Sequence, residues 1–332
     1  MTSPRHAPDA WSIRPLQPEM ARLLHDLKDF PDLIAVTARD QAIDPGLVEK
    51  DYWIMHCLWG LQQLGMAFEL KGGTSLSKGY QLIHRFSEDI DILIHPPEGT
   101  PTGKNHNKEV QVEARRAFFD ALPPQLLIPG VTSAERDHDF DDHAYMRSAG
   151  VRLRYRAIAP LPEGVKEGIL LEAGFDQVSP NQPRLISSWA YDKAVESGVE
   201  VEDNRARDVA CYEPGYTLVE KLQTISTKFR KQQADGALPV NFLRHYYDVH
   251  CLLADPATQA FIGTEDYLAH KARRFRKDDE PNLRDNPAFT LADAEIRELY
   301  AEAFEGTRSL YYRDRPSFAD ILARIEPELD RL

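Results

Sequence analysis

The sequence predicts an α+β protein in which a mixed β-sheet with flanking helices is followed by a C-terminal helical bundle. Three patterns indicate this fold class: helical spacing of apolar residues before residue 65, short alternating stretches between residues 67 and 175, and helical periodicity alone after about residue 213. We therefore expect two domains, residues 1–212 with the sheet and the N-terminal helices and residues 213–332 with the bundle.

The predicted strands are short and apolar and are bounded by turn residues; they cover residues 67–70, 88–94, 143–149, 151–158 and 168–175. The two strands on either side of Gly150 are expected to pair as a hairpin that turns near this glycine. The predicted helices place apolar side chains at helical spacing; they lie within residues 17–65 and cover 75–83, 107–122, 215–232, 240–254, 263–277, 291–304 and 317–325.

The charge and the apolar content of the chain argue against two classes of protein, nucleic-acid coat proteins and membrane proteins. The 332 residues carry 53 acidic and 40 basic side chains, a net charge of −13, which argues against a general nucleic-acid coat because phosphate binding needs clustered Lys and Arg. Basic stretches at residues 147–156 and 270–277 leave two readings open, a local basic groove or solvated surface charge. No run approaches the roughly 18 apolar residues that cross a bilayer, so we expect no membrane contact and a cytoplasmic location.

Gly72 and Gly73 stand between a predicted strand and a predicted helix. Adjacent glycines let the backbone approach a ligand closely, and the N-terminus of the helix that follows offers free N–H groups, so this turn is a candidate phosphate cradle. It is not a Walker loop, because the order Ser77-Lys78-Gly79 does not contain the required GK[ST]. The alternative is an ordinary turn.

Asp89 and Asp91 lie one residue apart on the strand that follows. Successive strand residues point to opposite faces, so both carboxylates project from one face, about 6.5 Å apart along the chain, and this spacing suits one or two Mg²⁺ ions bridged to a triphosphate. Glu172, on a separate predicted strand, is a candidate third ligand. The alternatives are a polar, solvent-exposed strand face and a rival acidic cluster at residues 137–143.

Five motifs in order carry a resemblance to a known family: "EKDYWIMHCL" (49–58), "LKGGTSLSKGY" (70–80), "RFSEDIDI" (85–92), "LVEKLQTIS" (218–226) and "RHYYDVHCL" (244–252). With them the sequence resembles the nucleotidyltransferase toxins of the AbiEii/AbiGii type, relatives of the MenT toxins. The resemblance implies a polymerase-β-like nucleotidyltransferase core that uses an NTP with Mg²⁺ or Mn²⁺. It also implies a toxin–antitoxin or abortive-infection system, with a cognate antitoxin protein as partner.

The resemblance also implies roles for single residues. Asp89, Asp91, Lys221 and Asp248 match the catalytic positions, with the two strand aspartates as metal ligands. The nucleotide-binding positions match Gly72, Gly73, Thr74, Ser75, Arg85, Ser87 and again Lys221. One departure is His245, where members of the family often carry Asp. From spacing alone, Arg244 and Asp248 could instead form a surface ion pair, and Lys221, Thr224 and Lys228 could instead be a solvated helix face.

The expected reaction is transfer of a nucleoside monophosphate from an NTP to an acceptor hydroxyl, which the resemblance suggests is an RNA, particularly a tRNA 3′ end. Either Glu172 or Asp248 could accept the hydroxyl proton. Two alternatives stay open. The acceptor could be a protein hydroxyl, including this chain's own Ser75 or Thr74, or the protein could be a non-catalytic module that binds an NTP and a partner.

Overall fold

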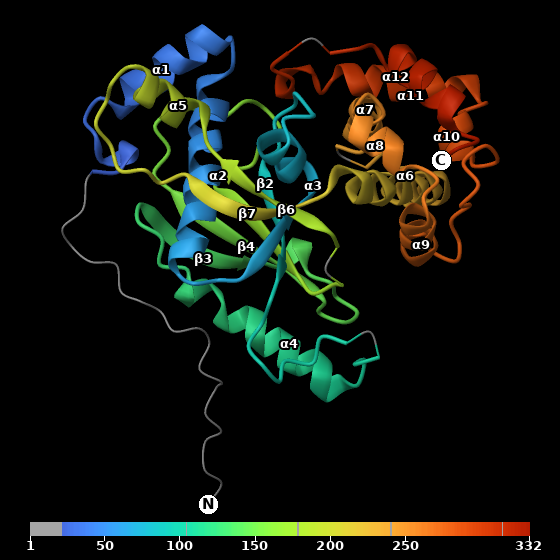
Figure 1. The fold of residues 1–332 in the computed structure, drawn as a ribbon, viewed down its shortest axis with the longest axis horizontal. Helices are drawn as coiled ribbons and strands as arrows, with labels where there is room; N and C mark the ends of the chain where they lie inside the picture. Colours follow the sequence, from blue (N-terminus) through green and yellow to red (C-terminus); the bar gives the residue numbers. More distant parts are fainter. Residues whose placement is uncertain (1–21, 104, 178, 240, 314) are drawn as a thin grey trace, which may run out of the picture. The chain divides into compact units, whose positions relative to one another are not determined.

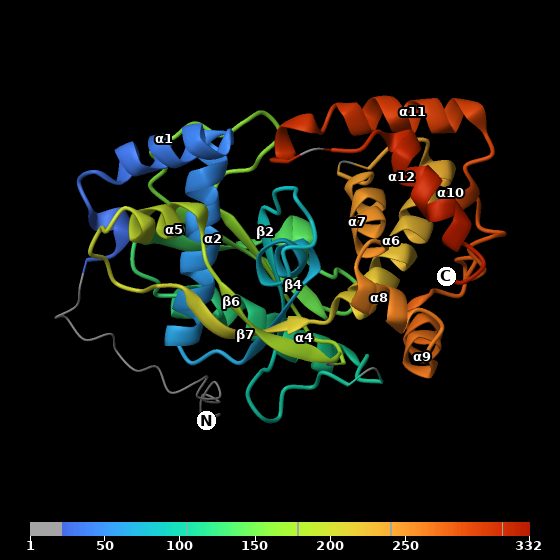
Figure 2. The ribbon, with the colours of Figure 1, turned by 45° about the horizontal axis from the view of Figure 1, so that its top comes forward.

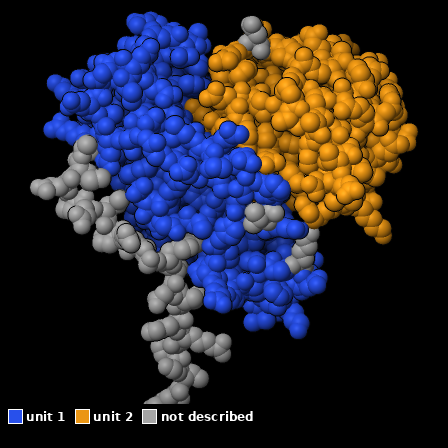
Figure 3. Space-filling model, in the orientation of Figure 1, with its two compact units in different colours: residues 1–74, 87–211 blue, residues 75–86, 212–332 orange. Residues whose placement is uncertain are grey.

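The computed structural model describes residues 22–332 apart from 104, 178, 240 and 314, and the chain divides into two compact units (Figure 3). Unit 1 comprises residues 1–74 and 87–211, and unit 2 comprises residues 75–86 and 212–332. Unit 2 thus includes a short segment from early in the chain. Compactness does not measure independent folding, so the domain boundary expected after residue 212 stays a prediction.

Unit 1 is built on a sheet whose strands run in the order β3-β4-β5-β2-β1-β7-β6 (Figure 1). The strands are β1 (Phe68–Lys71), β2 (Asp89–Ile94), β3 (Val131–Asp137), β4 (Ser148–Tyr155), β5 (Ile169–Gly174), β6 (Asn181–Ile186) and β7 (Ala206–Tyr212). β1 pairs antiparallel with β2 and parallel with β7, β2 pairs parallel with β5, and β4 pairs antiparallel with β3 and β5. The predicted mixed sheet is therefore confirmed, with β2 held between β1 and β5.

The hairpin predicted around Gly150 is wrong. Gly150 lies inside the single strand β4, opposite Asp137 of β3 and Glu172 of β5. A β-carbon at this position would lie 2.6 Å from the main-chain oxygen of Asp137. This glycine therefore permits close strand packing and does not mark a turn.

The helix α2 (Pro45–Gln63) is central to unit 1. It begins with a proline in its first turn and with Asp44 as N-cap, whose carboxylate accepts a hydrogen bond of 2.8 Å from the Gly46 N–H. Every residue from 46 to 61 is buried, because α2 contacts β2 and β5 of the sheet as well as its neighbours α1 (Phe30–Gln41) and α5 (Trp189–Glu196) (Figure 2).

Two helix predictions in unit 1 need correction. The helical stretch expected before α1 begins at residues 17–21, which lie outside the described residues, and its described part holds only the short 3₁₀ turn η1 (Leu24–Asp26). The helix expected at residues 75–83 begins at the glycines themselves, as the turn α3 (Gly72–Thr74), and continues as the π-helical turn η2 (Ser75–Gly79). By contrast, the helix expected at residues 107–122 is found as α4 (Glu109–Ala121).

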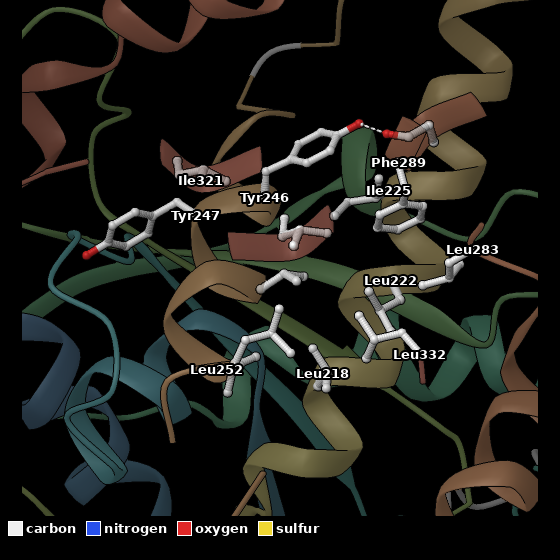
Figure 4. Close-up of a cluster of buried hydrophobic side chains, with 14 of the residues drawn as sticks. Leu218, Leu222, Ile225, Tyr246, Tyr247, Leu252, Leu283, Phe289, Ile321 and Leu332 are labelled. Carbon is white, nitrogen blue, oxygen red and sulfur yellow. Dashed lines mark hydrogen bonds between the residues drawn. The ribbon is translucent and has the colours of Figure 1, made fainter. Parts of the chain in front are cut away.

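Unit 2 is the predicted helical bundle. Its helices are α6 (Pro214–Asp235), α7 (Arg244–Leu252), α8 (Pro256–Phe261), α9 (Glu265–Arg274), α10 (Pro287–Thr290), α11 (Ala294–Glu305) and α12 (Phe318–Ile325). Leu218, Leu222 and Ile225 of α6 share an apolar core with Leu252 of α7 (Figure 4). Tyr246 joins this core and donates its hydroxyl hydrogen bond to the Ala288 oxygen at 2.6 Å, so its polar atom is satisfied.

The early segment of unit 2 is attached to the end of the bundle. Leu76 and Ile83 are buried in the apolar core of the unit. The Phe86 N–H donates to the Leu310 oxygen at 2.6 Å, and the Tyr312 hydroxyl donates to the Ile83 oxygen at 3.1 Å. In the described part of the chain, no helix combines the length and the apolar character needed to cross a membrane.

Candidate active site

Three carboxylates gather on one face of the sheet in unit 1. Asp89 and Asp91 alternate along β2 with the buried Ile90 and Ile92, and Glu172 lies on β5 directly opposite Asp91 in the parallel register. Because neighbouring strands lie about 4.8 Å apart, this register makes Glu172 the lateral neighbour of Asp91. The structure therefore brings together the three side chains that the sequence predicts as metal ligands.

The donor set fits a divalent cation that substrate helps to bind. Within the described residues, no three His, Cys, Asp or Glu side chains converge into a ready-made metal cage. Mg²⁺ characteristically uses only one or two protein carboxylates and completes its octahedron with waters and substrate phosphates. A group of carboxylate oxygens on an open sheet face is therefore compatible with Mg²⁺ or Mn²⁺, both of which prefer oxygen ligands.

The glycine turn lies against these carboxylates. Gly72 has a φ of +71°, and a β-carbon there would lie 2.4 Å from Oδ2 of Asp91. Thr74 then donates its hydroxyl hydrogen bond to the main-chain oxygen of Asp89 at 2.5 Å. The turn is thus fixed to the first residue of β2, and it needs glycine at its first position both for its backbone conformation and for its approach to Asp91.

The two serines predicted to bind nucleotide fall in different units. Ser75 belongs to unit 2 and is completely buried, and its hydroxyl has no hydrogen-bond partner among the described residues. Ser87 belongs to unit 1 and is half-buried, two residues before Asp89. A buried hydroxyl without a partner is uncommon in native structures, so Ser75 is a position where a bound ligand would satisfy a polar atom.

The rival acidic cluster at residues 137–143 is structural. Asp137 accepts hydrogen bonds from the Arg152 guanidinium at 3.1 and 2.6 Å, and Asp141 pairs with Arg136 at 2.6 Å. Asp142 caps the turn that follows by accepting hydrogen bonds from three main-chain N–H groups. These acids hold loops and basic side chains in place, and the Arg152 charge is neutralised within unit 1.

A residue that the sequence did not assign, Lys50, contacts the residue immediately before β2, the strand that carries Asp89 and Asp91. It is completely buried on α2, donates to the main-chain oxygen of Lys166 and lies 3.6 Å from the Glu88 carboxylate. Burial lowers the pKa of Lys50, and the negative charges of Glu88 and Asp89 oppose that shift. Lys50 therefore anchors the residue that immediately precedes Asp89. Its signal in the sequence is a charged triplet inside an otherwise apolar helix.

The neighbours of Lys50 in that triplet bind other loops. Glu49 accepts hydrogen bonds from the Ile158 and Ala159 N–H groups at 2.9 to 3.1 Å, and burial raises its pKa. Asp51 accepts one from the Trp189 N–H at the start of α5, at 2.9 Å. The motif "EKDYW" thus joins α2 to three separate parts of unit 1.

In unit 2, Asp248 is held by two cations. Arg85 donates from Nε and Nη2 to its two carboxylate oxygens at 2.6 and 2.7 Å, and Lys221 Nζ lies 2.9 Å from Oδ2. Burial alone would raise the pKa of Asp248, but Arg85 and Lys221 outweigh burial and lower it to about 2. The alternative of a surface ion pair is therefore wrong: Asp248 is fully buried, and the ion-pair partners found for it are Arg85 and Lys221.

His245, the departure from the family pattern, lies close to the same cations. Its side chain is buried, and neither ring nitrogen has a hydrogen-bond partner in the described part of the chain. Burial, followed by the positive charges of Lys221, Lys228 and Arg244, lowers its pKa well below the ordinary value, so the ring is neutral. Thr224, on the face shared by the two lysines, donates its hydroxyl to the Glu220 oxygen of its own helix at 2.8 Å.

Comparisons with known proteins place this geometry in context. The sequence matches the family model described as nucleotidyl transferase AbiEii toxin, type IV TA system, over residues 53–324. No curated protein matches the sequence. A solved structure described as an antigenic nucleotidyltransferase-like protein from Paracoccidioides brasiliensis is similar at 15% identity, covering 68% of this chain and 87% of that chain with a TM-score of 0.35.

Proposed function

Because the chain belongs to the AbiEii nucleotidyl transferase toxins of type IV toxin–antitoxin systems and is thus a nucleotidyltransferase, we propose that it transfers a nucleoside monophosphate from an NTP to an RNA hydroxyl. The preferred acceptor is a tRNA 3′ end. The observation that carries this proposal is the placement of Asp89, Asp91 and Glu172 on one face of the sheet, with Gly72 close to the Asp91 carboxylate.

Asp89 and Asp91 would hold the divalent cation, with Glu172 as the third candidate ligand. When bound, Mg²⁺ or Mn²⁺ supplies a Lewis acid that withdraws charge from the transferring phosphoryl group. The chain itself orients the carboxylates: Lys50 fixes the start of β2 through Glu88, and the register with β5 sets Glu172 beside Asp91. Such chemistry depends on positioning and electrostatics more than on covalent catalysis.

The remaining roles divide between binding and positioning. We assign phosphate binding to Gly72, Gly73, Thr74, Ser75 and Ser87 and charge neutralisation to Lys221. Arg85 donates all of its nitrogens within unit 2, to Asp248 and to the Phe86 oxygen at 3.2 Å. We therefore propose that Arg85 acts through Asp248, which in turn orients Lys221.

Of the two candidates for general base, Glu172 is preferred. A carboxylate whose pKa is about 2 and whose two oxygens are bound by Arg85 and Lys221 is a weak proton acceptor, which argues against Asp248. Glu172 lies on the reacting face and is half-buried.

Burial argues against self-modification. Thr74 is 1% exposed and Ser75 is 0% exposed, and the Thr74 hydroxyl is already donated to Asp89. An attacking hydroxyl has to reach the α-phosphorus, so these side chains are poor acceptors in this fold. A non-catalytic module gains nothing from three carboxylates placed together. Membership of the family also suggests a cognate antitoxin as partner and action in the cytoplasm.

A labelling experiment tests the proposal. Wild type, Asp89→Asn and the control Asp139→Asn are incubated with each α-³²P-labelled NTP, Mg²⁺ and total tRNA, and the products are resolved on a denaturing gel. Asp139 is exposed and has no role in the proposed site, so its variant is expected to keep wild-type activity. Asp89→Asn reduces RNA labelling by about 100- to 1000-fold, the usual cost of removing one electrostatic contact to the transition state.

Other outcomes point elsewhere. Label on protein in place of RNA would indicate protein nucleotidylation. NTP binding without transfer, equal in wild type and in Asp89→Asn, would contradict the enzymatic proposal and favour a binding module.

A further inference from the structure

A cavity of about 820 Å³ lies in unit 1 beside the carboxylates. Its wall includes Lys71, which pairs with Asp91 across β1 and β2, and Gly174, two residues beyond Glu172 on β5. Two residues span about 6.5 Å along a strand. The cavity therefore begins within one nucleotide's length of the carboxylates, and its volume is that of a typical small-ligand site.

The wall chemistry suits a nucleotide with a phosphate. Lys71 and Arg147 supply positive charge, and Asp176 supplies a negative charge. Arg147 Nη2 donates to the Asn107 Oδ1 at 2.8 Å. The Tyr145 side chain is 44% exposed, and the Arg147 guanidinium lies 5.9 Å from the centre of its ring. Proteins bind unpaired RNA bases by stacking them on aromatic rings or guanidinium planes, and they hold the backbone with cations. A protein serine or threonine would fill only a small part of this space.

A buried arginine shapes the cavity. Arg115 on α4 is completely buried and donates to the Tyr145 oxygen at 2.9 and 2.7 Å, to the Pro101 oxygen at 2.5 Å and to the His106 oxygen at 2.9 Å. It thereby joins the two loops that carry Asn107 and the tyrosine. Burial of a charged group is costly unless its hydrogen bonds are satisfied, so these contacts indicate a defined wall and not an incidental gap.

The glycine turn contacts the first residue of β2, and the cavity contacts a residue near the other end of this strand. Thr74 of the turn binds the main chain of Asp89, the first residue of the strand, whereas the cavity contacts Leu93 near its end. Asp91 lies between them. In phosphoryl transfer the attacking and leaving oxygens lie roughly in line on opposite sides of phosphorus. If the turn holds the leaving phosphates, the attacking hydroxyl arrives from the cavity.

We propose that this cavity binds the 3′-terminal nucleotide of the RNA acceptor, an inference that rests on the proposed function. Tyr145 stacks on the terminal base, and Arg147 and Lys71 bind the phosphate on its 5′ side. The terminal hydroxyl gives up its proton, to Glu172 or water, and its oxygen forms a bond to the α-phosphorus of the NTP. The bond from that phosphorus to the bridging oxygen breaks, and pyrophosphate leaves with the electron pair.

Kinetics provide the first test. Tyr145→Ala raises KM for RNA roughly 5- to 100-fold, the usual range for a lost stacking contact, and leaves KM for the NTP within about twofold of wild type. Tyr145→Phe, which keeps the ring, recovers most of that loss. Arg147→Gln also raises KM for RNA, and the control Arg39→Gln, an exposed arginine on α1, does not. A rise in KM for the NTP alone would overturn the proposal and assign the cavity to the incoming base.

Crosslinking provides a second test that needs no turnover. An RNA oligonucleotide ending in 4-thiouridine is irradiated with wild type and with Asp89→Asn, and crosslinked peptides are identified by mass spectrometry. Crosslinks on peptides that carry Asn107, Tyr145 or Gly174 are expected. Crosslinks elsewhere, or none, overturn the proposal even if RNA is labelled. Crosslinks in the cavity without any RNA labelling would instead refute the proposed function and leave the binding site standing.

Discussion

A side chain at position 72 is disfavoured for two reasons: the backbone φ there is +71°, and the Asp91 carboxylate occupies the space that a β-carbon would take. We predict that Gly72→Ala lowers transfer activity by at least about 100-fold, because the new methyl group displaces the Asp91 carboxylate, which we propose as a metal ligand. Gly65→Ala is the matched control, since Gly65 has a φ of +74° but no atom within 4 Å of its β-carbon. Both variants lose about 1 to 2 kcal/mol for the left-handed conformation. Thermal unfolding first compares the stability of the two variants, and RNA labelling then measures their transfer activity. Equal activity of the two variants would contradict this prediction.

The buried pair of Lys50 and Glu88 gives a second prediction at the same scale. Lys50→Met leaves a buried carboxylate without its cation, which costs about 3 to 5 kcal/mol of unfolding free energy. Lys28→Met, at an exposed position, costs under about 0.5 kcal/mol. Urea denaturation measures both. The double variant Lys50→Met with Glu88→Gln should be more stable than Lys50→Met alone, and additive losses would show that the two side chains do not interact.

Single residues also show where the sequence is informative. The spacing of Asp89 and Asp91 was sufficient to put both carboxylates on one face, and the strand pattern around Glu172 was sufficient to predict a third. Lys50 could not be assigned in this way, because its partners lie at residues 88 and 166 and only tertiary structure brings them together.

Among the elements, α6 and α7 are joined by a buried ion cluster whose stability depends on pH. The pKa of Asp248 is lowered from 3.8 to about 2, so its stabilising effect is complete above pH 4 and is lost as the pH falls towards 2. We predict that the difference in unfolding free energy between wild type and Asp248→Asn is largest above pH 4. Below that pH it shrinks by up to roughly 2 kcal/mol.

Urea titrations between pH 6 and pH 3 measure this difference. Asp235→Asn, which removes an exposed carboxylate from the end of α6, serves as control and shows no such trend. A difference that stays constant with pH would mean that Asp248 does not gain its stabilising charge through folding.

Helices and strands were predicted correctly where their apolar residues recur in a regular pattern. The longer bundle helices α6, α7, α9, α11 and α12 and strands β1, β2 and β5 carry a buried stripe or face, and they were predicted close to their observed bounds, whereas the short helices α8 and α10 were not predicted. β3 exposes or half-buries every residue, and β6 buries only its last, so neither carries the apolar alternation that marks a strand. Of the two strands predicted around Gly150, the second is found largely within β4, but the first is wrong for residues 143–147, which lie outside any strand; a glycine in a strand interior resembles a turn in sequence.

For the whole molecule, the net charge of −13 means that RNA binding must rely on a few local cations. If Lys71 and Arg147 supply two phosphate contacts, KM for RNA rises about sevenfold between 50 and 200 mM salt, because each contact to a single strand contributes a logarithmic slope of about 0.7. Arg147→Gln reduces the rise to under about threefold. A salt-independent KM would contradict RNA as acceptor, and a rise above about 1000-fold would indicate a much more extended basic surface.

The α+β class and the C-terminal bundle were predictable for the whole chain, but the composition of unit 2 was not. Residues 75–86 join the bundle through Leu76 and Ile83, whose apolar character is equally compatible with a place in either unit. The contacts with residues 310–312 and the Arg85–Asp248 ion pair distinguish the two, and they connect segments far apart in the sequence.

That interrupted unit has a consequence for synthesis on the ribosome. When residue 86 leaves the exit tunnel, the helices that bury Leu76 and Ile83 have not yet been made, and about 125 further residues must be added before unit 2 resumes at residue 212. At 5 to 20 residues per second this wait lasts roughly 6 to 25 seconds. Folding of residues 75–86 is therefore timed by translation, and a nascent or truncated chain carries Asp89 and Asp91 on β2 without a completed unit 2.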